Sequence, residues 1–220
     1  MGFWKNTTWF ATDEVSAVCA GITGALHEIG LRPCSPPEFD QELGDALQYG
    51  RATTSELVVV LVAAGADGWC LVKSAPLETL AEAGSTGRPL LSEVSERVDA
   101  EGFQHDIYDG DASVLLEVLP DGSVSASGYH SLGGDPLDFH GVRISPDRFK
   151  TRCSLIEAPA VRSAFARGGS PDDVAFMLAE RLGGPAADLD DNLPIVELVH
   201  GNIEAPEGVA VLCFERTGPR

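Results

Sequence analysis

The stretch FQHDIYDGDASVLLEVLPDGSVSASGYH, residues 103–130, decides the fold class of this chain. Pro120 suits the first corner of a type I turn, and Gly122 tolerates the positive φ of the G1 bulge that follows such a turn. On both sides of the turn apolar and polar residues alternate, as they do in a strand with one buried face; the apolar positions are Val114, Leu116, Val118, Val124 and Ala126. The stretch therefore predicts three strands, two of them joined by a short hairpin loop.

The rest of the chain supplies further strands and amphipathic helices. Strands are predicted over residues 3–10, 57–63, 69–73, 195–199 and 209–214. Helices are predicted after Thr12 up to Gly30, over 38–48, after Pro76, after Pro89 and from Ser170 to Gly183. Because most neighbouring strands are joined by hairpins, the pattern predicts an α+β fold: a mainly antiparallel sheet built from hairpins, with amphipathic helices packed on it.

A length of 220 residues fits a single α+β domain, 1–220, and also allows two lobes, 1–131 and 132–220. The possible boundary marks a change of character. From Ser131 to Gly169 the chain contains prolines and scattered aromatic residues but no sustained helical or strand periodicity of apolar residues. This indicates a long irregular connection.

The charge of the chain restricts its partners. With 34 acidic and 15 basic residues the formal net charge is −19, so nucleic acids and anionic membrane surfaces would repel it at long range. A basic protein partner fits this charge better. One segment runs against the trend, because Arg143 to Arg167 contains six basic and two acidic residues. This basic cluster would receive an anionic ligand or pair with the acidic surface of the protein itself.

The sequence also bears on location and origin. The first ten residues lack the apolar core of a secretory signal, and the longest apolar run, Leu57 to Ala64, is too short to cross a membrane. We therefore expect a soluble, cytoplasmic protein, and its wealth of Ala, Gly, Asp and Arg suggests a bacterial genome rich in G and C. The five cysteines form no C-x-x-C pair, which favours reduced, mostly buried thiols over a metal or redox role.

Motifs with a specific mechanism do not survive inspection. His130-Ser131-Leu132-Gly133-Gly134 resembles the nucleophile elbow of α/β-hydrolases, but Tyr129 stands where the elbow needs glycine and Pro136 opposes the helix that must follow. Asp188 begins a calcium-loop-like run, but Leu193 and Val199 occupy the positions that require Gly and Glu. We therefore predict no catalytic residues, no metal and no cofactor.

Two functions follow as hypotheses. The first is a non-catalytic protein-binding or regulatory module, comparable by charge alone with inhibitors or immunity proteins that neutralise basic enzymes. The alternative is a small enzyme or small-ligand-binding protein with a dispersed site near His130, Ser131, His140 and the Arg143 to Arg167 cluster. The residues chosen as candidate ligand contacts are His130, His140, Arg143, Arg148 and Arg152.

Overall fold

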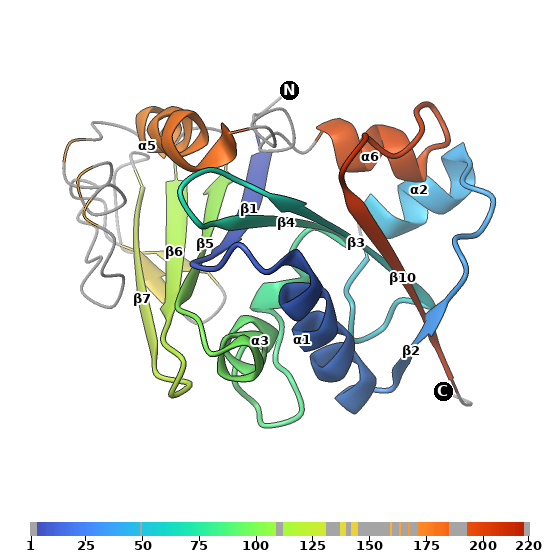
Figure 1. Ribbon diagram of the computed structural model, residues 1–220, viewed down its shortest axis with the longest axis horizontal. Coiled ribbons are helices and arrows are strands. Elements are labelled where there is room, and N and C mark those ends of the chain that lie inside the picture. The colour runs from blue at the N-terminus through green and yellow to red at the C-terminus, as the bar shows by residue number, and fades with distance from the viewer. Residues whose placement is uncertain are drawn as a thin grey trace.

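The chain folds around one eight-stranded antiparallel sheet, seen in the computed structural model of Figure 1. The structure describes residues 4–48, 50–108, 112–130, 137–139, 142–144, 171–184 and 193–217, with the single positions 159, 163 and 167. Helices pack on both faces of the sheet. This arrangement confirms the predicted α+β class with a mainly antiparallel sheet.

The sheet has the order β2-β10-β3-β4-β1-β5-β6-β7. Its strands are β1 (Trp4–Phe10), β2 (Leu31–Cys34), β3 (Leu57–Ala64), β4 (Cys70–Ala75), β5 (Gly102–Tyr108), β6 (Ala112–Val118), β7 (Val124–His130) and β10 (Ala210–Arg216). Three hairpins, β3-β4, β5-β6 and β6-β7, form from chain neighbours. The other pairings are long-range, since β1 inserts between β4 and β5, and β10 inserts between β2 and β3.

The helices form two layers. On one face lie α1 (Val15–Glu28) and α3 (Leu90–Val98), side by side in Figure 1, with the short 3-10 helix η1 (Thr79–Ala81) beside α3. On the other face lie α2 (Gln41–Gln48), α5 (Pro171–Leu178), which continues as the π-helical turn η2 (Ala179–Gly183), and α6 (Leu193–Val199). Alternate residues of β3, β4, β6 and β10 therefore enter two separate apolar clusters.

Strands β3 and β1 show how alternating side chains divide the apolar residues between the two clusters. In β3, Val58, Val60 and Val62 face α1, while Val59, Leu61 and Ala63 face the opposite layer. Trp9 of β1 packs in that opposite layer against Phe103 of β5, with ring centroids 6.5 Å apart. Phe10, the next residue, belongs to the α1 and α3 side.

The hairpin predicted at Pro120 to Gly122 forms as expected. Gly122 has φ +77°, its N–H donates to the Leu119 carbonyl at 2.8 Å, and the Leu119 N–H donates to the Ser123 carbonyl at 3.0 Å. The side chain of Asp121 accepts from the Ser123 N–H at 2.8 Å. The turn chemistry thus fixes the register of β6 against β7.

Four elements differ from the sequence prediction. The strand predicted over 195–199 is wrong, because these residues belong to helix α6, whose buried positions Ile195, Leu198 and Val199 follow helical spacing. The short strand β2 was not predicted, because Pro33 suggested irregular chain; Pro33 instead occupies an edge strand, where proline is tolerated. The two short strands β8 (Leu137–Phe139) and β9 (Val142–Ile144) lie within the stretch predicted to be irregular.

None of the helices in the described parts of the chain is both long and apolar enough to cross a membrane. Residue 131, at the lobe boundary considered from the sequence, lies outside the described residues.

Candidate functional site

Polar side chains are concentrated inside the sheet, in the central strands β1 and β5. Lys5, Asn6, Thr7 and Thr8 are at most 7% exposed, and Gln104, His105 and Asp106 at most 3%. The strands pair residue by residue, with Asn6 opposite Asp106 and Thr7 opposite His105. Because side chains alternate along a strand, these residues divide into two groups, one on each face of the sheet.

The group on the α1 and α3 face forms a hydrogen-bonded network around Asp106. The Asp106 carboxylate accepts from the Asn6 side-chain amide, and the Gln104 amide nitrogen lies 3.2 and 3.0 Å from its two oxygens. Thr8 donates its hydroxyl to the Gln104 side-chain oxygen at 3.2 Å. A buried carboxylate is tolerated in an apolar layer when donors surround it, and here the donors come from both strands.

Tyr108, two residues after Asp106 in β5, links this strand to Glu78, the residue before η1. Its hydroxyl donates to Glu78 at 3.2 Å, and burial together with the negative charges of Asp106 and Glu78 raises the pKa of the phenol. The phenol therefore remains protonated at any physiological pH, and it acts as a hydrogen-bond donor.

The group on the opposite face contains Lys73 of β4, Thr7 and His105. The Lys73 ammonium donates to the Thr7 hydroxyl at 2.7 Å and to the Asn6 carbonyl. The His105 Nε2 lies 3.3 Å from the Ser113 hydroxyl of β6. Burial and the positive charge of Lys5 lower the pKa of His105 to about 3, so its imidazole is neutral.

The His105 and Ser113 pair resembles a base next to a nucleophile, but its electrostatics oppose that use. A general base works best when its pKa lies near the working pH, and a histidine of pKa about 3 is a weak base at neutral pH. We therefore assign this polar array to the fold: it holds β1 between β4 and β5.

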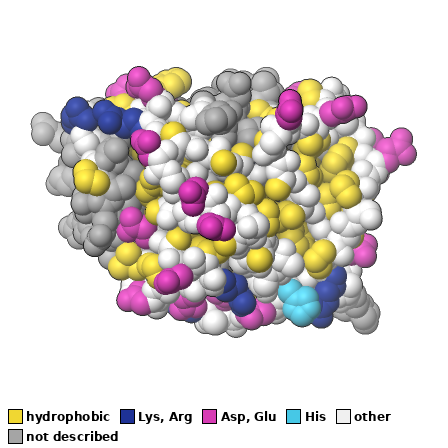
Figure 2. All heavy atoms as spheres, in the orientation of Figure 1, with side chains coloured by type: hydrophobic (Ala, Val, Ile, Leu, Met, Phe, Trp, Pro, Cys, Tyr) yellow, Lys and Arg dark blue, Asp and Glu magenta, His cyan; other side chains and the backbone are white. Residues whose placement is uncertain are grey.

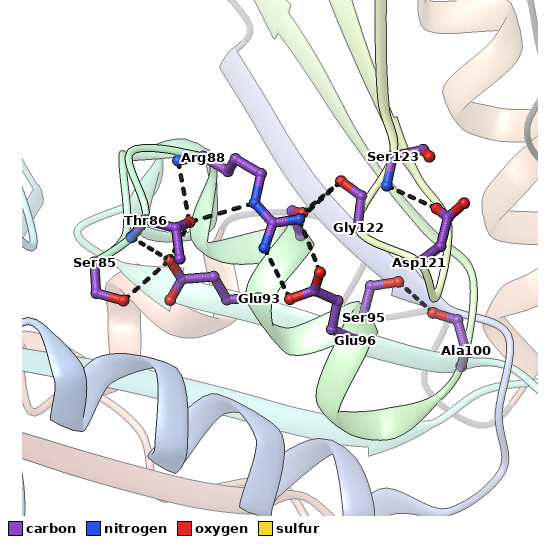
Figure 3. A network of polar contacts seen from close by, with 11 residues as sticks. Ser85, Thr86, Arg88, Glu93, Ser95, Glu96, Ala100, Asp121, Gly122 and Ser123 are labelled. Atoms are coloured by element: carbon purple, nitrogen blue, oxygen red, sulfur yellow. Dashed lines mark hydrogen bonds and ion pairs between the residues drawn. The ribbon is translucent and has the colours of Figure 1, made fainter.

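A second polar network joins α3 to the β6-β7 hairpin (Figure 3). Arg88 donates two hydrogen bonds of 2.8 Å to the Glu96 carboxylate and one of 3.1 Å to the Gly122 carbonyl. Ser92 donates to the same carbonyl at 3.1 Å. Glu93, 2% exposed, accepts from the Thr86 N–H at 3.0 Å and from its hydroxyl at 2.9 Å. The network anchors the hairpin tip and the 84–88 loop on α3.

The third candidate is a surface, formed where α2 packs against α6. The two helices approach closely, since a Cβ at Gly44 would lie 1.7 Å from the His200 ring. The His200 Nε2 lies 3.4 Å from the Asp45 carboxylate. A Cβ at Gly201, just after α6, would lie 2.4 Å from the backbone carbonyl oxygen of Phe39. The loop after α6 therefore joins the start of α2 in one surface.

This α2–α6 surface, which we define by its exposed residues, is acidic. Its members are Glu38, Asp40, Glu42, Asp45, Ile203, Glu204 and Glu207. Asp40 also caps α2, because its carboxylate accepts from the Leu43 N–H at 2.8 Å. Ile203, 41% exposed, is one of the few large apolar side chains that the described part of the chain presents to solvent. Figure 2 shows acidic side chains along this border of the molecule, with hydrophobic ones beside them.

The sequence contains a signal for this surface that belongs to no catalytic or metal-binding motif. Residues 33–50 and 182–215 contain eleven acidic residues and no lysine or arginine. Their proximity in space was hidden, because the second segment was expected to contribute a strand and contributes α6 instead.

The residues predicted to contact a ligand are mostly outside the described chain. His130 ends β7, with Ala112 as its strand partner, and Arg143 lies in β9 opposite Asp138. His140, Ser131, Arg148 and Arg152 lie outside the described residues. Within the described ranges, no three His, Cys, Asp or Glu side chains are grouped so that they would hold a metal ion.

Comparison with known proteins gives no relative. No family model matches the sequence, and no curated protein and no solved structure shows a significant match.

Proposed function

We propose that the protein is a non-catalytic binding module that uses the α2–α6 surface to dock a basic protein partner. The supporting observation is that two segments far apart in sequence, both without lysine or arginine, pack together in the structure. The exposed residues of these two segments combine carboxylates with the apolar side chain of Ile203. An apolar contact with a charged rim is the usual composition of a protein interface.

The charge of this surface gives the partner its chemistry. Six of its seven defining residues are acidic, and the two segments that supply them contain none of the 15 basic residues. Such a surface attracts cationic proteins and steers their approach, and this steering weakens as salt shortens the screening length. The partner therefore has a basic surface with an apolar centre that covers Ile203.

The buried polar residues of β1, β4 and β5 support the same proposal, because their ionisable groups are poorly suited to acid–base catalysis. These groups are held by neighbouring strands, and His105 is a weak base at neutral pH. A binding role needs no activated group, because the affinity comes from the surface.

The test compares two charge-reversal variants of equal net charge. In Glu42→Lys with Glu204→Lys, both changes lie on the α2–α6 surface; in the control, Asp13→Lys with Glu180→Lys, both lie on exposed positions elsewhere. Each protein is immobilised and exposed to the lysate of its natural source at about 0.01 M and about 0.15 M salt. The retained proteins are then identified and their association rates are measured.

We expect the first variant to lose at least about tenfold in association rate with the retained basic protein, and the control to lose much less. Equal losses in both variants would show that only the total charge matters and would refute the docking surface. Retention of no basic protein at low salt would refute the binding module itself and leave the small-ligand or enzyme hypothesis around His130 and His140.

A further inference from the structure

Two cysteines from distant parts of the chain lie directly opposite each other in the sheet. Cys34 ends the edge strand β2, and Cys213 lies in β10 as its register partner. Both are free thiols. Cys213 is 4% exposed and Cys34 is partly exposed, on the face of the sheet that α2 and α6 cover.

The hydrogen-bond pattern defines the spacing of this pair. The Thr217 N–H donates to the Gly30 carbonyl at 3.2 Å, which makes Arg216 and Leu31 a non-hydrogen-bonded pair. Since the two kinds of pair alternate along an antiparallel ladder, Cys213 and Cys34 form a hydrogen-bonded pair. Their Cα atoms are then about 5.5 Å apart, which lies within the range of about 4.4–6.8 Å that disulfides span.

Closing the bond requires a small movement. Cβ atoms of a hydrogen-bonded pair lie near the upper end of about 4.5–5.5 Å, whereas a disulfide needs about 3.5–4.5 Å. Strand β2 is suited to this movement because it has four residues, lies at the sheet edge and contains Pro33, which has no N–H to donate. The resulting bond is strained and therefore easily reduced.

We propose that Cys34 and Cys213 form a reversible disulfide that fastens the edge strand β2 to β10, with a low-molecular-weight disulfide as the oxidant. The Cys34 thiolate attacks the oxidant, one sulfur leaves as a thiolate, and Cys34 carries a mixed disulfide. The Cys213 thiolate then attacks Cys34 and releases the second small thiolate. The two released thiolates take up the two protons that the cysteines lose, so one disulfide is reduced as the other forms.

Electrostatics determine the speed of these steps, and the exposure of the two thiols determines their order. Burial and the charge of Glu215 raise the pKa of Cys34, and burial and the neighbouring Cys34 raise that of Cys213 to about 11. Both thiols are protonated at neutral pH, so oxidation is slow there and faster at alkaline pH. Cys34 reacts first because its thiol is the more exposed of the two.

The opposite face supplies a matched control. Cys19 of α1, also partly exposed, influences the pKa of the buried Cys70 of β4, which rises to about 11. One of these two thiols lies on a helix and the other on a strand, so no pairing of neighbouring strands places them opposite each other. The proposal therefore predicts a disulfide for the Cys34 pair and none for the Cys19 pair.

The experiment oxidises the folded protein with oxidised glutathione at alkaline pH, followed by alkylation of free thiols, intact mass measurement and peptide mapping. We expect the loss of two free thiols per chain and one cross-linked peptide that joins Cys34 to Cys213. Dithiothreitol should restore both thiols without unfolding the protein. Cys34→Ala should abolish the cross-link, Cys19→Ala should retain it, and Cys213→Ala should leave one glutathione on Cys34.

Circular dichroism of each variant confirms that it is folded before oxidation. An unchanged thiol count in the wild type would overturn the proposal, and so would a cross-link between any other two cysteines, Cys153 included. Survival of the cross-linked species in Cys34→Ala would overturn it as well.

Discussion

Strands β3 and β1 are both interior strands of one sheet, but β3 buries apolar side chains and β1 buries polar ones. Residues 58–63 of β3 are apolar and at most 3% exposed on both faces, whereas residues 5–8 of β1 are polar and at most 7% exposed. A slip of β3 by one residue would exchange its two faces and still bury valines. The same slip in β1 would carry Asn6 away from Asp106, so the polar strand specifies the register that the apolar strand leaves open.

The largest effect should therefore come from the polar strand pair. Asp106→Ala removes the acceptor for Asn6 and Gln104 and leaves their amide donors buried without it. We expect a loss of about 3–5 kcal/mol in the free energy of unfolding, because breaking a buried polar cluster exposes its members to an apolar layer. Val60→Ala, in the apolar strand, should cost only about 2 kcal/mol through a small cavity.

Urea unfolding followed by tryptophan fluorescence measures both values. If Val60→Ala proves the more costly of the two, the polar network contributes little and the comparison of the strands fails.

The second prediction compares two loops in which a glycine has nearly the same positive φ. Gly122 and Gly87 have φ +77° and +78°, but a Cβ at Gly122 would lie 1.8 Å from Arg88 and 2.2 Å from Glu96, whereas a Cβ at Gly87 would meet nothing within 4 Å. Gly87→Ala should therefore cost about 1 kcal/mol for the left-handed backbone alone. Gly122→Ala should cost about 3 kcal/mol, because it also displaces the ion pair that anchors the hairpin on α3.

Thermal unfolding of the two variants provides the measurement. Adding Arg88→Ala and Glu96→Ala to each variant serves as the control, since the two changes remove both obstacles at Gly122 and leave Gly87 with its backbone cost. Equal losses at the two glycines would show that the network in Figure 3 does not hold the hairpin.

The same contrast explains what the sequence could predict. The run of β3 and the turn at Gly122 are local signals, and both elements appear where they were expected. The insertion of β10 between β2 and β3 is a pairing of residues far apart in the chain, with Cys34 opposite Cys213, and no local pattern contains it. The strand predicted from Ile195 to Val199 was wrong because a short apolar stretch fits a strand and a helix equally well.

The α2–α6 surface likewise combines a local sequence signal with a long-range contact. The absence of lysine and arginine from residues 33–50 and 182–215 is visible in the sequence, but the contact between α2 and α6 is not. The buried array was equally hidden, because Asn6 meets its partner Asp106 one hundred positions later.

The smallest effect concerns His105, the ionisable group that the polar layer keeps neutral. Burial and Lys5 lower the pKa of His105 to about 3, whereas a histidine in the unfolded chain has a pKa of about 6.5. Below about pH 6.5 the unfolded chain binds a proton that the folded protein does not, so the contribution of His105 to stability is present above that pH and is lost as the pH falls toward 3. At pH 5 the loss should be about 2 kcal/mol relative to pH 7.5.

The carboxylates of an acidic protein also titrate in this range, so the measurement must be differential. His105→Gln replaces the imidazole with an amide that can still bond Ser113 but takes up no proton. Subtracting its free energy of unfolding from that of the wild type at each pH cancels the carboxylates common to both. We expect a difference that is constant above pH 7 and that falls by about 1.4 kcal/mol for each pH unit below 6. A flat difference down to pH 4.5 would mean that His105 takes up its proton inside the folded protein, and the polar layer would then be open to water rather than sealed between β1, β5 and β6.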